Sequence, residues 1–257
     1  MEGRHVAQRL KTPRFRRRGV RIPVLLLLLA GAGGPRLAAH LAAQGGGTGR
    51  LEGVATIAKV LTAIHQRIRV YDEPGTPPPK SGADKDPLAN VVIYLESTPT
   101  LRSVTSTATH ATPELRQRDE TFVPHVLPVL VGSTVQFPND DPLYHDVFSL
   151  SATKTFDLQR YPKGTSRSLV FGKAGVVEVF CHIHADMSAY ILVRDNPFFV
   201  IPDAQGHFAL DGIPAGDYTL IAWYERTKPV VTKVSIAAAQ TRSVAIRIPI
   251  PESPGHP

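Results

Sequence analysis

Residues 176–193 read VVEVFCHIHADMSAYILV, and this stretch indicates the architecture around it. Two short runs rich in β-branched and aromatic residues, Val176–Phe180 and Ala189–Val193, flank a polar segment. Such runs predict short strands. We therefore expect two strands whose connecting loop presents Cys181, His184 and Met187.

Further short strand candidates, separated by turn residues, recur along the chain. Proline accounts for 23 of the 257 residues, about 9% against a usual ~5%, which suits many strands joined by turns. No long segment has helical periodicity, so the pattern predicts an all-β protein built of sandwiches, with loops at 74–87 and 97–114. The other strand candidates are Gly53–Val60, Arg67–Tyr71, Val91–Leu95, Leu127–Val131, Thr134–Phe137, His145–Ser149, Ser168–Phe171, Phe208–Leu210, Tyr218–Tyr224, Val231–Ile236 and Ser243–Ile248.

Basic residues concentrate at the start of the chain. Residues 1–43 carry nine of the 29 Lys and Arg but one of the 22 Asp and Glu, so the remainder is close to neutral and gives no support for a nucleic-acid surface. The basic RFRRRGVR, the apolar IPVLLLLLA at 22–30 and the LAA at 41–43 predict a signal peptide over 1–43. An uncleaved anchor is the alternative. We expect a flexible leader at 44–50 and a periplasmic or extracellular protein with no stable membrane span once the signal is cleaved.

The loop FCHIHADM at 180–187 carries a compact set of soft ligands, Cys181, His184 and Met187. Sulfur ligands favour Cu(I), and imidazole suits both oxidation states of copper. His145, at the start of a candidate strand, is the natural further donor. Two His, one Cys and a weak axial Met form a blue-copper electron-transfer site, so we predict one copper ion at these four residues.

The alternative is that Cys181 is a small buried hydrophobe and Met187 packs in the core. An exported chain with one Cys cannot form an internal disulfide, and it would expose a lone thiol to oxidants unless the sulfur is buried or ligated. The combination of Cys, His and Met at this spacing after a β-rich run favours the metal site.

The segments 122–149 and 156–199 resemble cupredoxins, and most closely the plastocyanin-like proteins of the methylamine utilisation type. The resemblance implies a Greek-key β-sandwich, the copper ligands His145, Cys181, His184 and Met187, and a redox partner such as a c-type cytochrome. Two departures stand out: Asp146 replaces the usual Asn after the first His, and the spacing from His184 to Met187 is shorter than usual.

Residues 203–225 resemble the carboxypeptidase regulatory-like (transthyretin-like) β-sandwich module, a non-catalytic unit. We therefore expect a copper domain over 51–195, completed by the N-terminal strand candidates, a carboxypeptidase regulatory-like β-sandwich over 196–250 and a tail at 251–257.

No Ser-His-Asp constellation, P-loop or GxGxxG motif indicates an enzyme, and a multicopper oxidase would need several His-x-His pairs where only His182 with His184 is present. A copper chaperone or store without redox turnover, and a structural two-sandwich protein without metal, remain open beside the electron carrier. His125 reads as structural, and Asp140, Asp141, Asp146 and Asp186 read as loop formers and a solvated rim that could steer a basic partner. The remaining candidates for surface or tail positions are His65, His110, His207 and His256.

Overall fold

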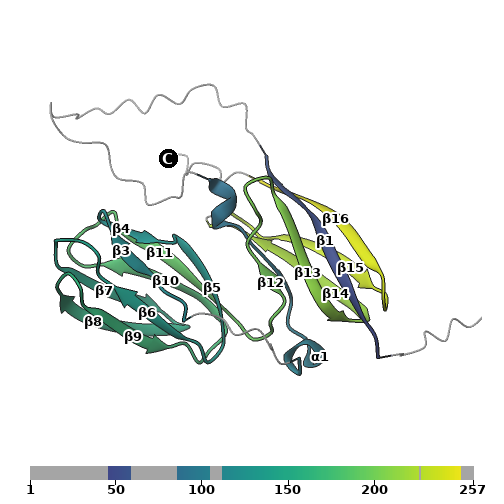
Figure 1. Ribbon diagram of the computed structural model, residues 1–257, viewed down its shortest axis with the longest axis horizontal. Coiled ribbons are helices and arrows are strands. Elements are labelled where there is room, and N and C mark those ends of the chain that lie inside the picture. The colour runs from purple at the N-terminus through teal and green to yellow at the C-terminus, as the bar shows by residue number, and fades with distance from the viewer. Residues whose placement is uncertain (1–45, 59–85, 105–111, 226, 250–257) are drawn as a thin grey trace, which may run out of the picture. The chain divides into compact units, whose positions relative to one another are not determined.

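The structure, a computed structural model, describes residues 46–58, 86–104, 112–225 and 227–249, and these are largely β-strand. Beside strands β1–β16 they contain one helical turn, α1 (Pro99–Arg102), and one 3-10 turn, η1 (Pro87–Asn90). The all-β class expected from the sequence is confirmed. Figure 1 shows two groups of strands: β3–β11 form what we call the contiguous sandwich, and β1, β2 and β12–β16 form the composite sandwich.

The contiguous sandwich packs a five-stranded sheet, in the order β5-β11-β10-β7-β8, against the strand pairs β3-β4 and β6-β9. Isolated bridges from residue 114 to 136 and from residue 117 to 139 link these two pairs. Buried apolar side chains from both layers form one core between them. The strands are β3 (Arg116–Arg118), β4 (Thr121–Val123), β5 (Val126–Leu130), β6 (Thr134–Pro138), β7 (His145–Ser151), β8 (Lys154–Tyr161), β9 (Ser166–Val170), β10 (Gly175–Cys181) and β11 (Ser188–Arg194).

Strand β10 shows why the chain places its one thiol inside. Successive side chains of a strand point to opposite faces of the sheet. Val177, Val179 and Cys181 are buried, while Glu178 between them is exposed. The apolar alternation of VVEVFC therefore carries Cys181 to the core face at the very end of the strand.

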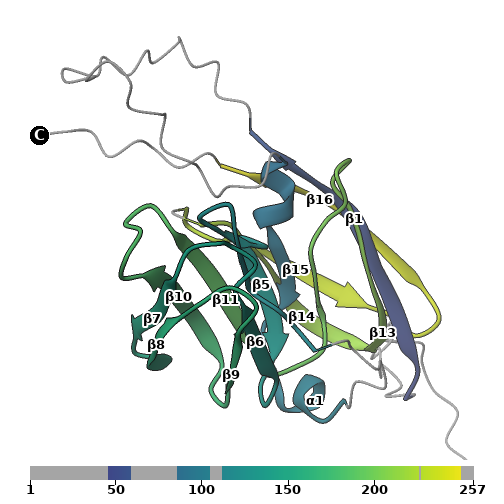
Figure 2. The same cartoon turned by 60° about the vertical axis from the view of Figure 1, so that its left-hand side comes forward.

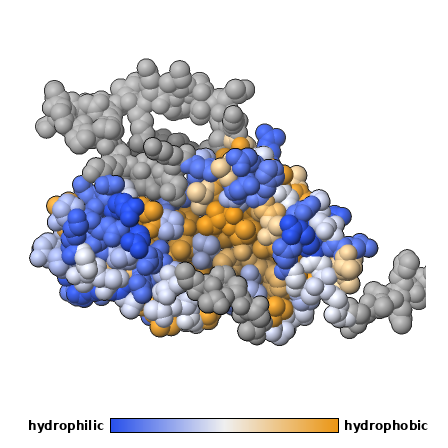
Figure 3. All heavy atoms as spheres, viewed as in Figure 1, coloured by the Kyte–Doolittle hydropathy of each residue, from blue (hydrophilic) through white to orange (hydrophobic). Residues whose placement is uncertain are grey.

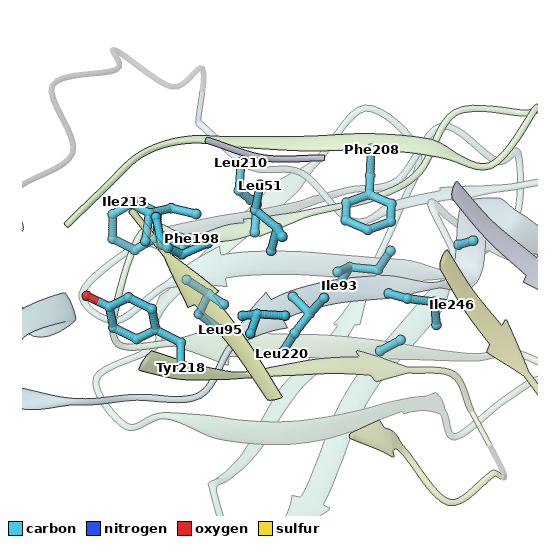
Figure 4. Packing of buried hydrophobic residues seen from close by; sticks show 14 of the residues in the cluster. Leu51, Ile93, Leu95, Phe198, Phe208, Leu210, Ile213, Tyr218, Leu220 and Ile246 are labelled. Carbon is cyan, nitrogen blue, oxygen red and sulfur yellow. The ribbon is translucent and has the colours of Figure 1, made fainter. Parts of the chain in front are cut away.

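The composite sandwich packs the sheet β13-β1-β16 against the sheet β12-β2-β14-β15. Figure 4 shows side chains of both sheets meeting in its core, among them Leu51 of β1, Ile93 of β2, Phe208 of β13 and Leu220 of β14. The strands are β1 (Thr48–Ile57), β2 (Val92–Leu95), β12 (Phe199–Val200), β13 (His207–Pro214), β14 (Gly216–Trp223), β15 (Val230–Ile236) and β16 (Thr241–Ile248).

The expected place of the two described N-terminal strands, β1 and β2, is wrong. β1 does not extend the sandwich around the site: it lies between β13 and β16, antiparallel to the first and parallel to the second (Figures 1 and 2). β2 likewise pairs with β12 and β14. The described N-terminal strands therefore belong with the C-terminal segment, so the expected domains at 51–195 and 196–250 do not match the strand pairing.

The sandwich around the site does not need β1 and β2 because it contains strands that the sequence analysis does not predict. Strand β8, KTFDLQRY, is rich in polar residues, and half of its side chains are exposed. Figure 3 shows a hydrophilic surface over the part of the contiguous sandwich that contains β8. β3 and β4 are three residues each, too short for a periodicity signal. With these included, β3–β11 complete a sandwich without N-terminal help.

Smaller differences concern expected loops. Residues 48–50, expected as part of a flexible leader over 44–50, already belong to β1. The expected loop at 97–114 contains α1, whose first turn is capped by the Thr98 hydroxyl accepting from the Leu101 amide at 3.2 Å. Leu101 is buried in the composite core, so this turn is part of that sandwich.

Several predictions fall outside the described residues: the signal peptide at 1–43, the strand Arg67–Tyr71 and the tail at 251–257. Within the described ranges, no helix has the length and apolar character needed to cross a membrane. The resemblance of the C-terminal segment to the carboxypeptidase regulatory-like module stays a prediction.

Candidate metal centre

Three of the four predicted ligands come together at one end of the contiguous sandwich. Cys181 ends β10, His145 begins β7, and His184 lies in the loop between β10 and β11. The Cys181 Sγ lies 3.7 Å from Nδ1 of His145 and 3.7 Å from Nδ1 of His184. The two imidazole rings are 4.9 Å apart between centroids. One thiol and two imidazole nitrogens therefore face a common point.

Strand pairing explains how residues far apart in sequence meet here. β7 and β10 are antiparallel neighbours, with Cys181 opposite Val147. Across their ends, the His182 amide donates to the Asp146 carbonyl at 2.9 Å. His145 is thus carried beside Cys181 by a sheet, which holds its position far more firmly than a loop would.

The loop that carries His184 and Met187 is closed by its own backbone. The Met187 amide donates to the His184 carbonyl at 3.1 Å, and the Cys181 amide donates to the Met187 carbonyl at 3.3 Å. Met187 is buried, at 1% exposure, in the same core cluster as Cys181. Its place beside the site is compatible both with an axial thioether and with simple packing, so its role as a ligand stays a prediction.

The site favours the thiolate form of Cys181. Burial disfavours the charged sulfur, but hydrogen bonds from His145 and from the amides of Asp146, Ile183 and His184 outweigh it and lower the pKa of Cys181 to about 6. The thiolate is the form that binds metals. For His145, burial disfavours the imidazolium, yet the bonds to Cys181 and Asp141 prevail and raise its pKa.

The residue that sequence reasoning missed is Asp141. It was expected in a solvated rim, but it is buried, at 4% exposure. Nε2 of His145 lies 2.8 Å from the Asp141 Oδ2. In the sequence Asp141 is one of two adjacent aspartates in a turn, PNDDP, and no local pattern shows that the chain would fold one of them inward. The remaining rim residues are partly or fully exposed: Asp140, Asp146 and Asp186.

The other predicted histidines lie apart from the three-residue cluster. Nδ1 of His125 lies 3.0 Å from the Ser188 carbonyl and its Nε2 lies 3.1 Å from Glu225, which agrees with a structural role. His182 is exposed and stacks on Phe148, with 3.6 Å between ring centroids. His207 is exposed in the composite sandwich. Outside the described residues lie His65, His110 and His256.

The spacing of the donor atoms fits a small metal ion. Bonds of about 2.0–2.1 Å to imidazole nitrogen and about 2.3 Å to thiolate sulfur, opened by about 110–120°, separate nitrogen from sulfur by about 3.6–3.8 Å. Both observed distances are 3.7 Å. The donor set, one thiolate and two imidazoles, suits copper. The residues present therefore fit a copper ion.

The known proteins that match the chain are found among solved structures. No protein-family model matches the chain, and no curated protein matches it. Solved structures that it resembles include a purple cupredoxin from Nitrosopumilus maritimus, at 22% identity and a TM-score of 0.30, over 32% of this chain and 99% of that one. A reduced Cu(I) form of an amicyanin variant matches at 21% identity and a TM-score of 0.31, over 40% of this chain and 98% of the amicyanin chain. A copper-containing nitrite reductase from Thermus scotoductus matches at 24% identity and a TM-score of 0.32, over 38% of this chain and 27% of the reductase chain.

Proposed function

We propose that this chain is an exported copper protein that carries one electron at a time, with one copper ion bound by His145, Cys181 and His184 and with Met187 as the axial ligand. The observation that supports it is the pair of 3.7 Å distances from one buried, readily ionised sulfur to two imidazole Nδ1 atoms. When bound, copper supplies a one-electron Cu(I)/Cu(II) couple.

The chain contributes rigidity. His145 and Cys181 lie on adjacent strands of one sheet, and the backbone bonds of residues 181–187 fix the loop that carries His184. Because the donors are already in place, little rearrangement accompanies a change of charge at the site. Small rearrangement is what a fast electron carrier needs.

The surface near His184 is the proposed route for electrons. His145, Cys181 and Met187 are buried, whereas His184 is partly exposed. Exposed apolar side chains occur in the adjoining loops, namely Leu143, Tyr144 and Ile183. We propose that a redox protein, such as a c-type cytochrome, docks over this edge, and that the chain is a carrier rather than an enzyme.

The test is the visible and EPR spectrum of the copper-loaded mature protein, followed by voltammetry. We expect one copper per chain, an intense thiolate-to-copper absorption and a reversible one-electron potential. A colourless Cu(II) protein would contradict the proposed site. Copper binding with transfer of the metal to a second protein, but no reversible potential, would instead show a chaperone or store, and absence of copper a structural protein.

Met187→Leu separates the axial ligand from packing. Leucine is similar in volume and apolar, so the loss of stability is expected to stay below about 1.5 kcal/mol. Leucine leaves the copper with three ligands, a low coordination number that Cu(I) accepts more readily than Cu(II), so the reduction potential is expected to rise. The measurements are chemical denaturation and voltammetry. An unchanged potential together with unchanged stability would assign Met187 to the core alone.

A further inference from the structure

The carboxylate of Asp141 is unusually well enclosed for an aspartate beside a loop. It accepts from Nε2 of His145 at 2.8 Å, from the Asp119 amide at 2.5 Å and from the Glu120 amide at 2.9 Å. The amide of Asp141 itself donates to Oδ1 of Asn139 at 2.9 Å. Three hydrogen bonds to one buried carboxylate favour its ionised form, because they offset the cost of burying the charge.

Two of these donors come from a turn with an uncommon backbone. Asp119 and Glu120 connect β3 to β4, with φ of 53° and 55°. Both values lie in the left-handed region, which costs about 1–2 kcal/mol for a residue with a side chain. Consecutive amides in such a turn can point toward the same anion. Here the anion is the Asp141 carboxylate, so this hairpin forms a cradle for it.

Further contacts attach the same hairpin to the neighbouring residue. The Asp140 amide donates to the Gln117 carbonyl at 2.9 Å, and the Asp140 carboxylate accepts from Arg118 at 3.0 Å and from Arg116. Asp141 is therefore held by the β3-β4 hairpin as well as by His145. It cannot swing away without breaking the hairpin contacts.

Resting on the proposed function, we propose that Asp141 is a positioning residue that fixes His145 with Nδ1 toward Cys181 and lowers the reduction potential of the bound copper. A carboxylate that accepts from Nε2–H leaves Nδ1 as the metal-binding nitrogen and raises its donor strength. A stronger donor with a nearby negative charge favours Cu(II) over Cu(I). The hairpin β3-β4 thus acts on the site through one hydrogen-bonded carboxylate.

Asp141→Asn tests the proposal, with Asp186→Asn as the matched control. The introduced amide keeps an oxygen for His145 and Glu120 but removes the charge. We expect the ratio of Cu(II) to Cu(I) affinity to fall about tenfold or more, a rise of about 59 mV for a one-electron couple. The control removes one negative charge from an exposed side chain of the loop between β10 and β11, where water screens it, and is expected to change the ratio by less than about twofold. Equal potentials in the two variants would overturn the proposal.

A measurement on the unaltered protein tests the role of Asp141 even where Asp141→Asn does not fold. In the diamagnetic Cu(I) protein, NMR is expected to show the His145 Nε2–H as a slowly exchanging, downfield proton. A rapidly exchanging proton, or an unprotonated Nε2, would overturn the role of Asp141. Failure of the unaltered protein to bind copper would refute the proposed function itself, whereas a copper protein with an unchanged potential in Asp141→Asn refutes only this inference.

Discussion

Cys181→Ser is expected to abolish the visible absorption of the copper(II)-loaded protein and to weaken copper binding more than about 100-fold. Loss of a group that merely supports a ligand already costs about 10–100-fold in metal affinity. Cys181 is a ligand candidate itself, and its pKa of about 6 makes it a thiolate at neutral pH. A serine hydroxyl is not ionised there, so the substitution removes the anionic donor while nearly preserving volume.

The variant needs a control that alters the same loop without touching the donors. Ile183→Ser is suitable, since Ile183 is two residues away and 39% exposed. Its copper content, absorption and EPR spectrum are expected to match those of the unaltered protein. Far-ultraviolet circular dichroism of both copper-free variants checks that the fold persists. A blue, redox-active Cys181→Ser protein would refute thiolate ligation.

The site could be predicted from sequence to the extent that it is local. Cys181, His184 and Met187 fall within one seven-residue stretch between strands of clear alternation, and the start of a further strand pointed to His145. Asp141 could not be predicted in the same way. Its burial depends on a hairpin about 20 residues upstream whose strands are too short to give a pattern.

The fold, like the site, could be predicted from sequence only where the signal is local. Most strands of the sandwiches appear in the sequence because one face of each is apolar, as with Leu51 and Ala55 of β1. Alternation shows that a strand has a buried face, but not which sheet buries it. β1 pairs with β16 from Arg50 opposite Thr241 to Ile57 opposite Ile248, a partnership between opposite ends of the chain that no local preference encodes.

This pairing predicts that a fragment of residues 196–257 is unfolded, although the sequence suggested a self-contained module there. Without β1, the strands β13 and β16 lose the strand that joins them, and without β2, β12 is separated from β14. The fragment also lacks Leu51, Ile93 and Leu95, all fully buried in the composite core. Each such side chain contributes about 2–5 kcal/mol by truncation data, against a total stability of about 5–15 kcal/mol.

A fragment of residues 112–196, in contrast, retains β3–β11 and every donor of the proposed copper site, and it is expected to fold and to keep the copper spectrum. Near-ultraviolet circular dichroism and thermal unfolding compare the two fragments. A cooperative unfolding transition in the 196–257 fragment would show that β1 and β2 are dispensable.

In the full chain, Leu51→Asp places an unpaired carboxyl in the core and is expected to lower the free energy of unfolding by several kcal/mol. Val54→Asp on the same strand, at a position 38% exposed, is expected to cost less than about 1 kcal/mol. Equal stabilities of the Leu51→Asp and Val54→Asp variants would contradict the burial of Leu51 between the sheets.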